Sequence, residues 1–117
     1  MLFNKTAKKQ VVSKVRIAKG FFGKLKGLMF ERKENFDYAL VFEFPYESRI
    51  GTSVHMLFVF FPIDIIFLDG KKNVVDKTGL TPWKVNYTPK SAAKYFIEMP
   101  HGSASKIGIG DKIEWET

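Results

Sequence analysis

Apolar and polar residues alternate along much of this chain, which predicts β-strands rather than helices. Over residues 11–18, Val11, Val15 and Ile17 fall on one face, while Lys14 and Arg16 fall on the other. Residues 36–44 show the pattern more cleanly, and Pro45 is expected to end that strand. The apolar face of this second segment consists of Phe36, Tyr38, Leu40, Phe42 and Phe44.

The middle of the chain is apolar at consecutive positions. Residues 54–61 are apolar on both faces, so we expect them to form an interior strand of the sheet. Pro62 interrupts the run, and a second apolar strand is predicted for residues 63–68. The pair Asp69-Gly70 predicts a turn after it, with residues 73–76 pairing back.

Further short strands are predicted towards the C-terminus. Residues 83–87 and 113–115 alternate in the same way, and residues 94–99 place Tyr95, Ile97 and Met99 opposite Lys94 and Glu98. Helical spacing is limited to Phe21, Leu25, Leu28 and Met29, where nearby glycines allow only one or two turns, and to residues 103–107, with Ser103 as the expected cap.

These elements predict a mainly β (α+β) fold. We expect a compact barrel-like or sandwich-like sheet of about eight short strands with one or two short helices. The chain has 117 residues and shows no internal repeat or linker. We therefore expect a basic N-terminal segment, residues 1–9, followed by a single β-rich domain, residues 10–117.

Composition excludes several classes of protein. The chain has no cysteine, which excludes a disulfide framework and thiolate metal sites. Twelve Phe, four Tyr and two Trp predict a dense aromatic core and exclude a disordered chain. We expect no signal peptide and no membrane span, because Asn4 and several lysines follow the first three residues and the longest apolar run is interrupted by Pro62 and Asp64. A cytoplasmic location is the prediction.

Positive charge is concentrated at the N-terminal end. Residues 1–33 contain ten Lys or Arg residues and one acid, within a formal net charge of +7 for the whole chain. Such a segment can attract nucleic acid, or it can simply be a solvated surface. The candidate polyanion-binding residues are Lys14, Arg16, Lys19, Lys24 and Lys26.

Few residues suggest catalysis or metal binding. His55 and His101 are far apart in sequence, and no known metal, phosphate-loop or nucleophile motif is present, so we expect no metal site and no cofactor. Asp64 is the most unusual carboxylate, because it lies between Ile63 and Ile65 and must be hydrogen-bonded or perturbed. The candidate binding-site or structural polar residues are His55, Asp64 and Asp69.

Several short segments together resemble a known family. In chain order they are Gly27-Leu28-Met29, Met56 with Pro62-Ile63-Asp64-Ile65-Ile66-Phe67-Leu68-Asp69, Val74-Val75, Pro89 with Ala92-Ala93-Lys94-Tyr95-Phe96-Ile97-Glu98, and Ile109-Gly110-Asp111-Lys112-Ile113. Over residues 10–115 this order resembles the domain of unknown function 192 family. The resemblance implies a small, single-domain, β-rich fold with short helical turns, and it implies no established activity.

The chain departs from that family at one place. Members commonly carry Trp-Met-Lys-Asn-Thr ahead of a Pro-Leu-Asp sequence, whereas this chain reads His55-Met56-Leu57-Phe58-Val59. A polar site built from those Lys, Asn and Thr side chains would be replaced here by apolar groups. The departure limits how far any shared ligand could be carried over.

Three functions remain open from the sequence. The first is a non-catalytic binding or accessory module for an unknown ligand or protein. The second is weak, sequence-independent nucleic-acid binding through the basic N-terminal third. The third is an enzyme of unrecognised chemistry centred on Asp64, which would require a pocket around that carboxylate.

Overall fold

The computed structural model describes residues 1–20, 23, 26–56, 58–84 and 86–117. In this part of the chain, eight strands and three 3-10 turns have defined bounds. They are β1 (Leu2–Asn4), β2 (Lys9–Val12), β3 (Lys14–Ile17), η1 (Lys33–Asn35), β4 (Tyr38–Ser48), η2 (Ile50–Thr52), β5 (Ile63–Leu68), β6 (Val74–Leu80), β7 (Ala93–Pro100), η3 (Ser103–Lys106) and β8 (Ile113–Trp115).

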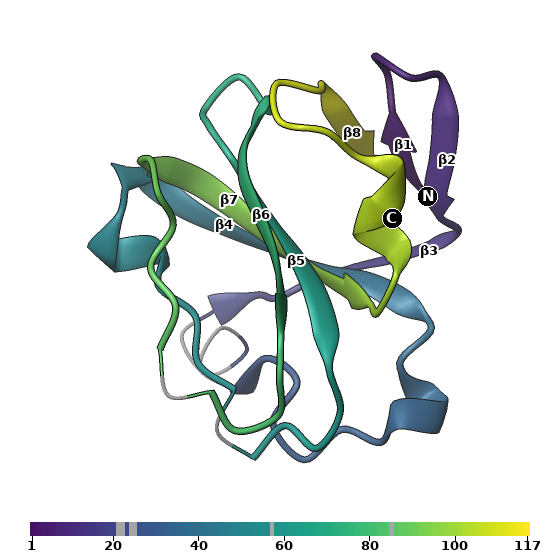
Figure 1. The fold of residues 1–117 in the computed structure, drawn as a ribbon, viewed down its shortest axis with the longest axis vertical. Helices are drawn as coiled ribbons and strands as arrows, with labels where there is room; N and C mark the ends of the chain where they lie inside the picture. The colour runs from purple at the N-terminus through teal and green to yellow at the C-terminus, as the bar shows by residue number, and fades with distance from the viewer. Residues whose placement is uncertain (21–22, 24–25, 57, 85) are drawn as a thin grey trace.

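The strands form two sheets (Figure 1). The larger sheet has the order β3-β4-β7-β5-β6, and the smaller has the order β2-β1-β8. Within the larger sheet, β3 and β4 are parallel, and the other neighbours are antiparallel. The first strand of the chain, β1, is therefore the centre of the small sheet, where Leu2 is fully buried.

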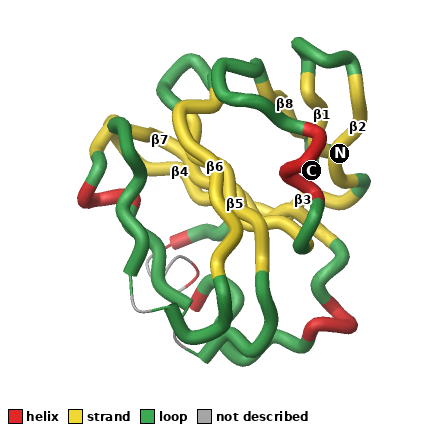
Figure 2. The backbone as a smooth tube through the Cα atoms, viewed as in Figure 1, coloured by secondary structure: helices red, strands yellow, loops and turns green. Residues whose placement is uncertain are grey.

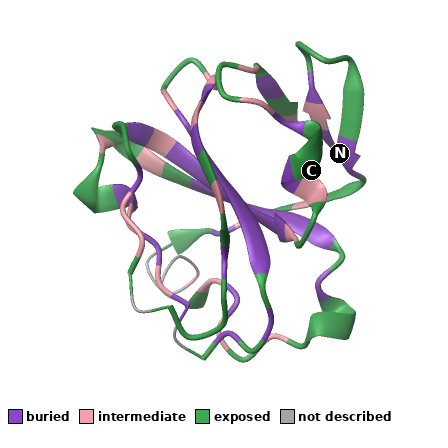
Figure 3. Cartoon of the chain, viewed as in Figure 1, coloured by how far each residue is buried: buried purple, intermediate pink, exposed green. Residues whose placement is uncertain are grey.

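Both faces of the large sheet are covered, which explains why β5, an interior strand between β7 and β6, is apolar at nearly every position. Every residue of β5 is buried (Figure 3). Ile63, Ile65 and Phe67 belong to one hydrophobic cluster, and Ile66 and Leu68 belong to a second cluster on the opposite face. The alternation of side chains along a strand divides the core between the two faces.

Different structures cover the two faces. The small sheet and η3 cover one face through residues such as Leu2, Ile107 and Ile113. On the other face, the cover consists mainly of loops and turns, which contribute Leu28, Val54 and the fully buried Met56. In Figure 2, the small sheet of β1, β2 and β8 lies at the upper right, whereas mostly loop segments lie below the large sheet.

The predicted fold class is confirmed, and the structure distinguishes between its two forms. Within the described residues, the strands form two open sheets and no closed barrel, so the sandwich-like arrangement is the one observed. The predicted single strand over residues 11–18 is two strands, because the chain passes from the small sheet to the large sheet between Val12 and Lys14. Pro45 does not end β4, which continues to Ser48 with irregular pairing to β7 beyond Glu43.

Two predicted strands are wrong. The described residues of the range 54–61 make one isolated bridge, between Val54 and Tyr87, and the chain turns at Phe58, whose φ is 59°. The described residues of the range 83–87 form no regular strand either, and Trp83 has a φ of 64°, which a strand does not allow. The two segments bond to each other instead, and the Trp83 amide donates to the Met56 carbonyl at 3.0 Å. Leu57 and Val85 lie outside the described residues.

The helical predictions have mixed outcomes. The turn predicted for residues 103–107 is confirmed as η3. Its cap is Gly102, with a φ of 94°, and Ser103 makes no capping hydrogen bond. Of the residues that suggested the other turn, Phe21 and Leu25 lie outside the described part of the chain, whereas Leu28 and Met29 lie in a turn that follows the helical residue Lys26.

Candidate functional site

A cavity of about 300 Å³ lies against the loop-covered face of the large sheet. We call it the Glu98 pocket. The strand residues Phe42, Phe44, Phe96 and Glu98 line it from the sheet. The loops complete the wall with Lys26, Gly27, Leu28, Met29, Gly51, Ser53, Val54, His55 and Val59.

The aromatic wall follows from strand pairing. Phe42 on β4 and Phe96 on β7 are register partners, and their rings stack with centroids 4.3 Å apart. Phe44 lies next to them, with its ring centroid 5.6 Å from that of Phe96. Three phenyl rings are thus held on one side of the cavity by the hydrogen-bonded register of two strands.

Glu98 is the unusual side chain of this pocket. It lies on β7 between Leu40 of β4 and Ile65 of β5, on the same strand face as Phe96. Glu98 is only 4% exposed, and among the described residues its Oε1 atom has no hydrogen-bond partner. Burial raises the pKa of Glu98 to about 8, because water is excluded from the charged form. The carboxyl is therefore mostly protonated at pH 7.

The loop over Glu98 depends on a glycine. Gly27 has a φ of +48°, and its amide donates to the Gly23 carbonyl at 3.1 Å. A Cβ at this position would lie 3.3 Å from Cζ of Phe42 and 3.7 Å from Oε1 of Glu98. The absence of a side chain at Gly27 lets the loop pass close to the carboxyl and to the aromatic wall.

Two other titratable side chains line the described wall of the pocket. Lys26 is exposed, which places its charge towards solvent, and His55 is half-buried. Of the three candidate polar residues from the sequence, His55 is the one that the structure places at this pocket. Tyr38 also lies near Glu98, and its hydroxyl donates a hydrogen bond to the Glu31 carboxylate at 3.0 Å. Burial, together with that hydrogen bond, raises the pKa of Tyr38 to about 12 and keeps it neutral.

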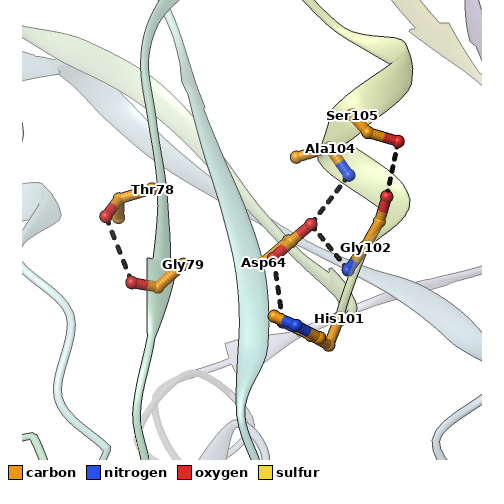
Figure 4. Close-up of polar contacts among 7 residues, drawn as sticks. All are labelled: Asp64, Thr78, Gly79, His101, Gly102, Ala104 and Ser105. Atoms are coloured by element: carbon orange, nitrogen blue, oxygen red, sulfur yellow. Dashed lines mark hydrogen bonds and ion pairs between the residues drawn. The ribbon is translucent and has the colours of Figure 1, made fainter.

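Asp64 lies on the opposite face of the sheet, where it holds η3 (Figure 4). Its Oδ2 atom accepts hydrogen bonds from the amides of Gly102 and Ala104, both at 2.9 Å. The Nδ1 atom of His101 is 3.5 Å from Oδ1. A depression lined by Asp64 and Lys77 is present here, but it is more open to solvent than the Glu98 pocket, and the Asp64 carboxylate already accepts two hydrogen bonds.

Asp69 lies in the turn between β5 and β6, away from both cavities described above. Its Oδ1 atom accepts hydrogen bonds from the amides of Lys71 and Asn73, both at 2.9 Å. These are the contacts of a turn-forming aspartate. The structure therefore does not bring His55, Asp64 and Asp69 together into one site.

Two of the candidate polyanion-binding residues already make contacts within the protein. Lys14 forms an ion pair with Asp37 at 2.6 Å, and Arg16 stacks over the Tyr38 ring at 4.0 Å. The hydrogen bond from Lys14 holds the pKa of Asp37 below its usual value. Lys19 and Lys26 are exposed, and Lys24 lies outside the described residues.

Several aromatic side chains that the strand patterns placed in the interior are on the surface. Phe58 is 39% exposed, and it contacts Phe30 and Trp83, with ring centroids 4.9 Å and 5.0 Å away. Phe60 also contacts Trp83. Phe58 is exposed because residues 54–61 leave the sheet and turn, so the strand periodicity assumed for them does not apply.

Sequence reasoning missed Glu98 as a site residue. The alternation over residues 94–99 places Glu98 on a polar face with Lys94, but that face is also covered. Phe96 lies between Lys94 and Glu98 on the same face and is buried. An apolar Phe on this otherwise polar face is the sequence signal that could have indicated that Glu98 is covered. Among the described residues, no group of three or more His, Cys, Asp or Glu side chains is arranged to hold a metal ion.

Fold and site together define a small two-sheet β domain with a largely apolar pocket around one carboxyl. A family model described as an uncharacterized ACR, domain of unknown function 192, matches residues 2–115. The chain belongs to this family, and the resemblance found in the sequence is confirmed.

Named relatives are similarly uncharacterised. The chain is 46% identical over 118 residues to a UPF0127 protein of Thermococcus sibiricus, covering 99% of this chain and 75% of that protein. It is 43% identical to a UPF0127 protein of Pyrococcus furiosus, covering 97% of each. A crystal structure of a protein of unknown function from Novosphingobium aromaticivorans has the same fold, with a TM-score of 0.73 and 23% identity over 86% of this chain and 74% of that one.

Some of the segments that carry the resemblance, or the departure from it, meet at the Glu98 pocket. Residues 27–29, Val59, Phe96 and Glu98 all belong to segments quoted for it or for the departure from it, and all line the cavity. The apolar Val59 stands where the family pattern has a polar residue, which makes this wall less polar.

In the part of the chain that the structure describes, no helix is long and apolar enough to span a membrane.

Proposed function

We propose that this protein is a non-catalytic binding module that takes a small, mainly apolar ligand into the Glu98 pocket. The observation that supports it is a cavity of about 300 Å³ with an aromatic wall and a single buried carboxyl. Apolar concave sites with a few placed polar groups are the usual form of small-ligand sites in proteins.

A catalytic role has less support. A nucleophile needs an adjacent base, and the hydroxyl of Ser53, which lines the pocket, already shares a hydrogen bond with the Thr88 hydroxyl at 2.9 Å. Asp64, the centre of the enzyme hypothesis, has its Oδ2 atom bonded to two backbone amides. These contacts favour a structural carboxylate, which orders η3 against β5.

Weak nucleic-acid binding is a second candidate function. It is favoured by the exposed Lys19 and Lys26, and by the exposed rings of Phe30 and Trp83, on which bases could stack. It is weakened by the ion pair of Lys14 with Asp37, which removes one of the predicted contacts. This candidate rests on surface charge, whereas the binding module rests on a formed cavity.

The test of the binding module is a titration followed by amide NMR. Indole is added to the wild type and to Met29→Trp, whose larger side chain is expected to occupy part of the pocket. We expect saturable shifts at Gly27, Val59 and Phe96 in the wild type, with a Kd between about 0.1 and 1 mM for a ligand of this size. The variant should bind at least about fivefold more weakly.

Tyr46→Trp is the matched control, since Tyr46 is 71% exposed and does not line the pocket. It should bind indole as the wild type does. Shifts scattered over the surface, or equal affinity in Met29→Trp and the wild type, would contradict the proposed function.

A further inference from the structure

The Glu98 pocket leaves one chemical requirement unmet. Its wall is apolar around a carboxyl that is 4% exposed, and Oε1 of that carboxyl has no hydrogen-bond partner among the described residues. An unpaired buried polar group costs free energy that a partner recovers. The ligand that gains most from this site is one that supplies the missing partner.

We propose that the ligand of this pocket carries an ammonium group, which pairs with the Glu98 carboxylate, attached to an apolar body that fills the cavity. This inference rests on the proposed function and specifies its ligand class. Phe42, Phe44 and Phe96 line the same cavity, so the apolar body of such a ligand would pack against these rings beside the carboxyl. Phenyl rings also attract cations that approach their faces.

The alternatives fit less well. A neutral hydroxyl could accept a hydrogen bond from protonated Glu98, but it would gain nothing extra from the aromatic wall. An anionic ligand would be drawn to Lys26, yet Lys26 is exposed and its charge is screened by water. Inside the cavity the anion would meet the acidic side chain of Glu98.

Binding of the ammonium ligand below about pH 8 releases one proton from Glu98 to solvent. In the free protein, burial holds the pKa of Glu98 at about 8, so the carboxyl enters the reaction as the neutral acid at pH 7. When the ammonium ion binds, the carboxyl O–H bond breaks, the proton goes to water, and the resulting carboxylate pairs with the ammonium ion. No covalent bond to the ligand forms, and no electron is transferred.

The proton exchange predicts how affinity depends on pH. Affinity should rise about tenfold per pH unit up to about pH 8 and then level off, since above that pH the carboxyl is already ionised. Among the described residues, the other charged or titratable groups near Glu98 are Lys26, His55 and Tyr38, together with Glu31, which accepts the hydrogen bond of the Tyr38 hydroxyl.

Three probes of one skeleton separate the ligand classes: tryptamine, tryptophol and indole-3-acetate, which carry an ammonium, a hydroxyl and a carboxylate group. Each is titrated into the protein by calorimetry and amide NMR at pH 6, 7, 8 and 9. At pH 8 we expect tryptamine to bind about tenfold or more tightly than tryptophol, and indole-3-acetate to bind most weakly.

Two variants assign the effect to its residue. Glu98→Gln keeps the shape of the side chain but cannot ionise, so it should lose both the preference for tryptamine and the dependence of affinity on pH. His101→Gln should retain both, because His101 lies beside Asp64 on the opposite face of the sheet and does not line the pocket. Tryptophol should bind wild type and Glu98→Gln within about twofold of each other, which shows that the variant still folds and keeps its pocket.

The outcomes are distinguishable. Tryptophol or indole-3-acetate binding in the pocket as tightly as tryptamine would overturn the ammonium proposal and leave the binding module intact. A pH dependence of affinity that persists in Glu98→Gln would overturn it as well. If none of the three probes perturbs the pocket amides at millimolar concentration, both the proposal and the proposed function fail.

Discussion

Replacing Glu98 by Gln should make the protein more stable at alkaline pH, although it removes a native carboxyl. The folded-state pKa of Glu98 is raised to about 8 from an ordinary value of 4.5, with burial as the cause. Between these two values, the folded protein holds a proton that the unfolded chain releases. Stability therefore falls as pH rises through this window and is fully present only below the unfolded-state pKa.

The magnitude follows from the width of the window. Each pH unit inside it is worth about 1.4 kcal/mol, so the wild type should lose about 4 kcal/mol between pH 5 and pH 8 through this one group. Glu98→Gln cannot ionise and should lose none of that stability. At pH 5 the two proteins should have similar free energies of unfolding, because the carboxyl is neutral in the folded protein.

Urea denaturation at pH 5, 6, 7 and 8, followed by tryptophan fluorescence, measures this difference. Glu34→Gln is the matched control, since Glu34 is exposed in η1 and should follow the wild type at every pH. The reasoning is refuted if the difference between Glu98→Gln and the wild type stays constant from pH 5 to pH 8. It is equally refuted if the variant is the less stable protein at pH 8.

Three further predictions concern stability and surface charge. Asp64→Asn should lower the free energy of unfolding by about 1–3 kcal/mol, measured by thermal melting, because the amide oxygen replaces a charged acceptor for two backbone N–H groups. Gly27→Ala should cost about 1–2 kcal/mol in urea denaturation and weaken indole binding, since a Cβ there is strained and meets Phe42. DNA binding, measured by fluorescence anisotropy, should be weak and independent of sequence at about 50 mM salt and should largely vanish by about 200 mM.

Each of these has an outcome that would contradict it. An unchanged melting temperature for Asp64→Asn, combined with lost ligand binding, would return Asp64 to the role of a site residue. Wild-type stability in Gly27→Ala would show that the loop over Glu98 readily changes its conformation. Nanomolar, sequence-selective DNA binding at physiological salt would show that the basic surface and the exposed aromatic rings are a specific site.

The local sequence pattern was enough to predict the fold class of this protein and its family. The alternation over residues 36–44, the continuous apolar run of β5 and the turn at Asp69 correctly predicted a mainly β fold, because strand periodicity and turn chemistry act over a few neighbouring residues. The ordered motifs also identified the family, since each motif could be read without knowing where it lies in space.

Tertiary structure decided the rest, and above all which faces are buried. The sequence of residues 54–61 predicts an interior strand, yet these residues form part of the loop cover of the large sheet. A run of apolar residues indicates that a segment is buried, but it does not indicate whether the segment is a strand or a loop that packs on one. Glu98 read as a surface residue, yet a loop turning at Gly27 closes over it. The protonation of that carboxyl depends on chain segments some seventy residues away, whose approach no local sequence window contains.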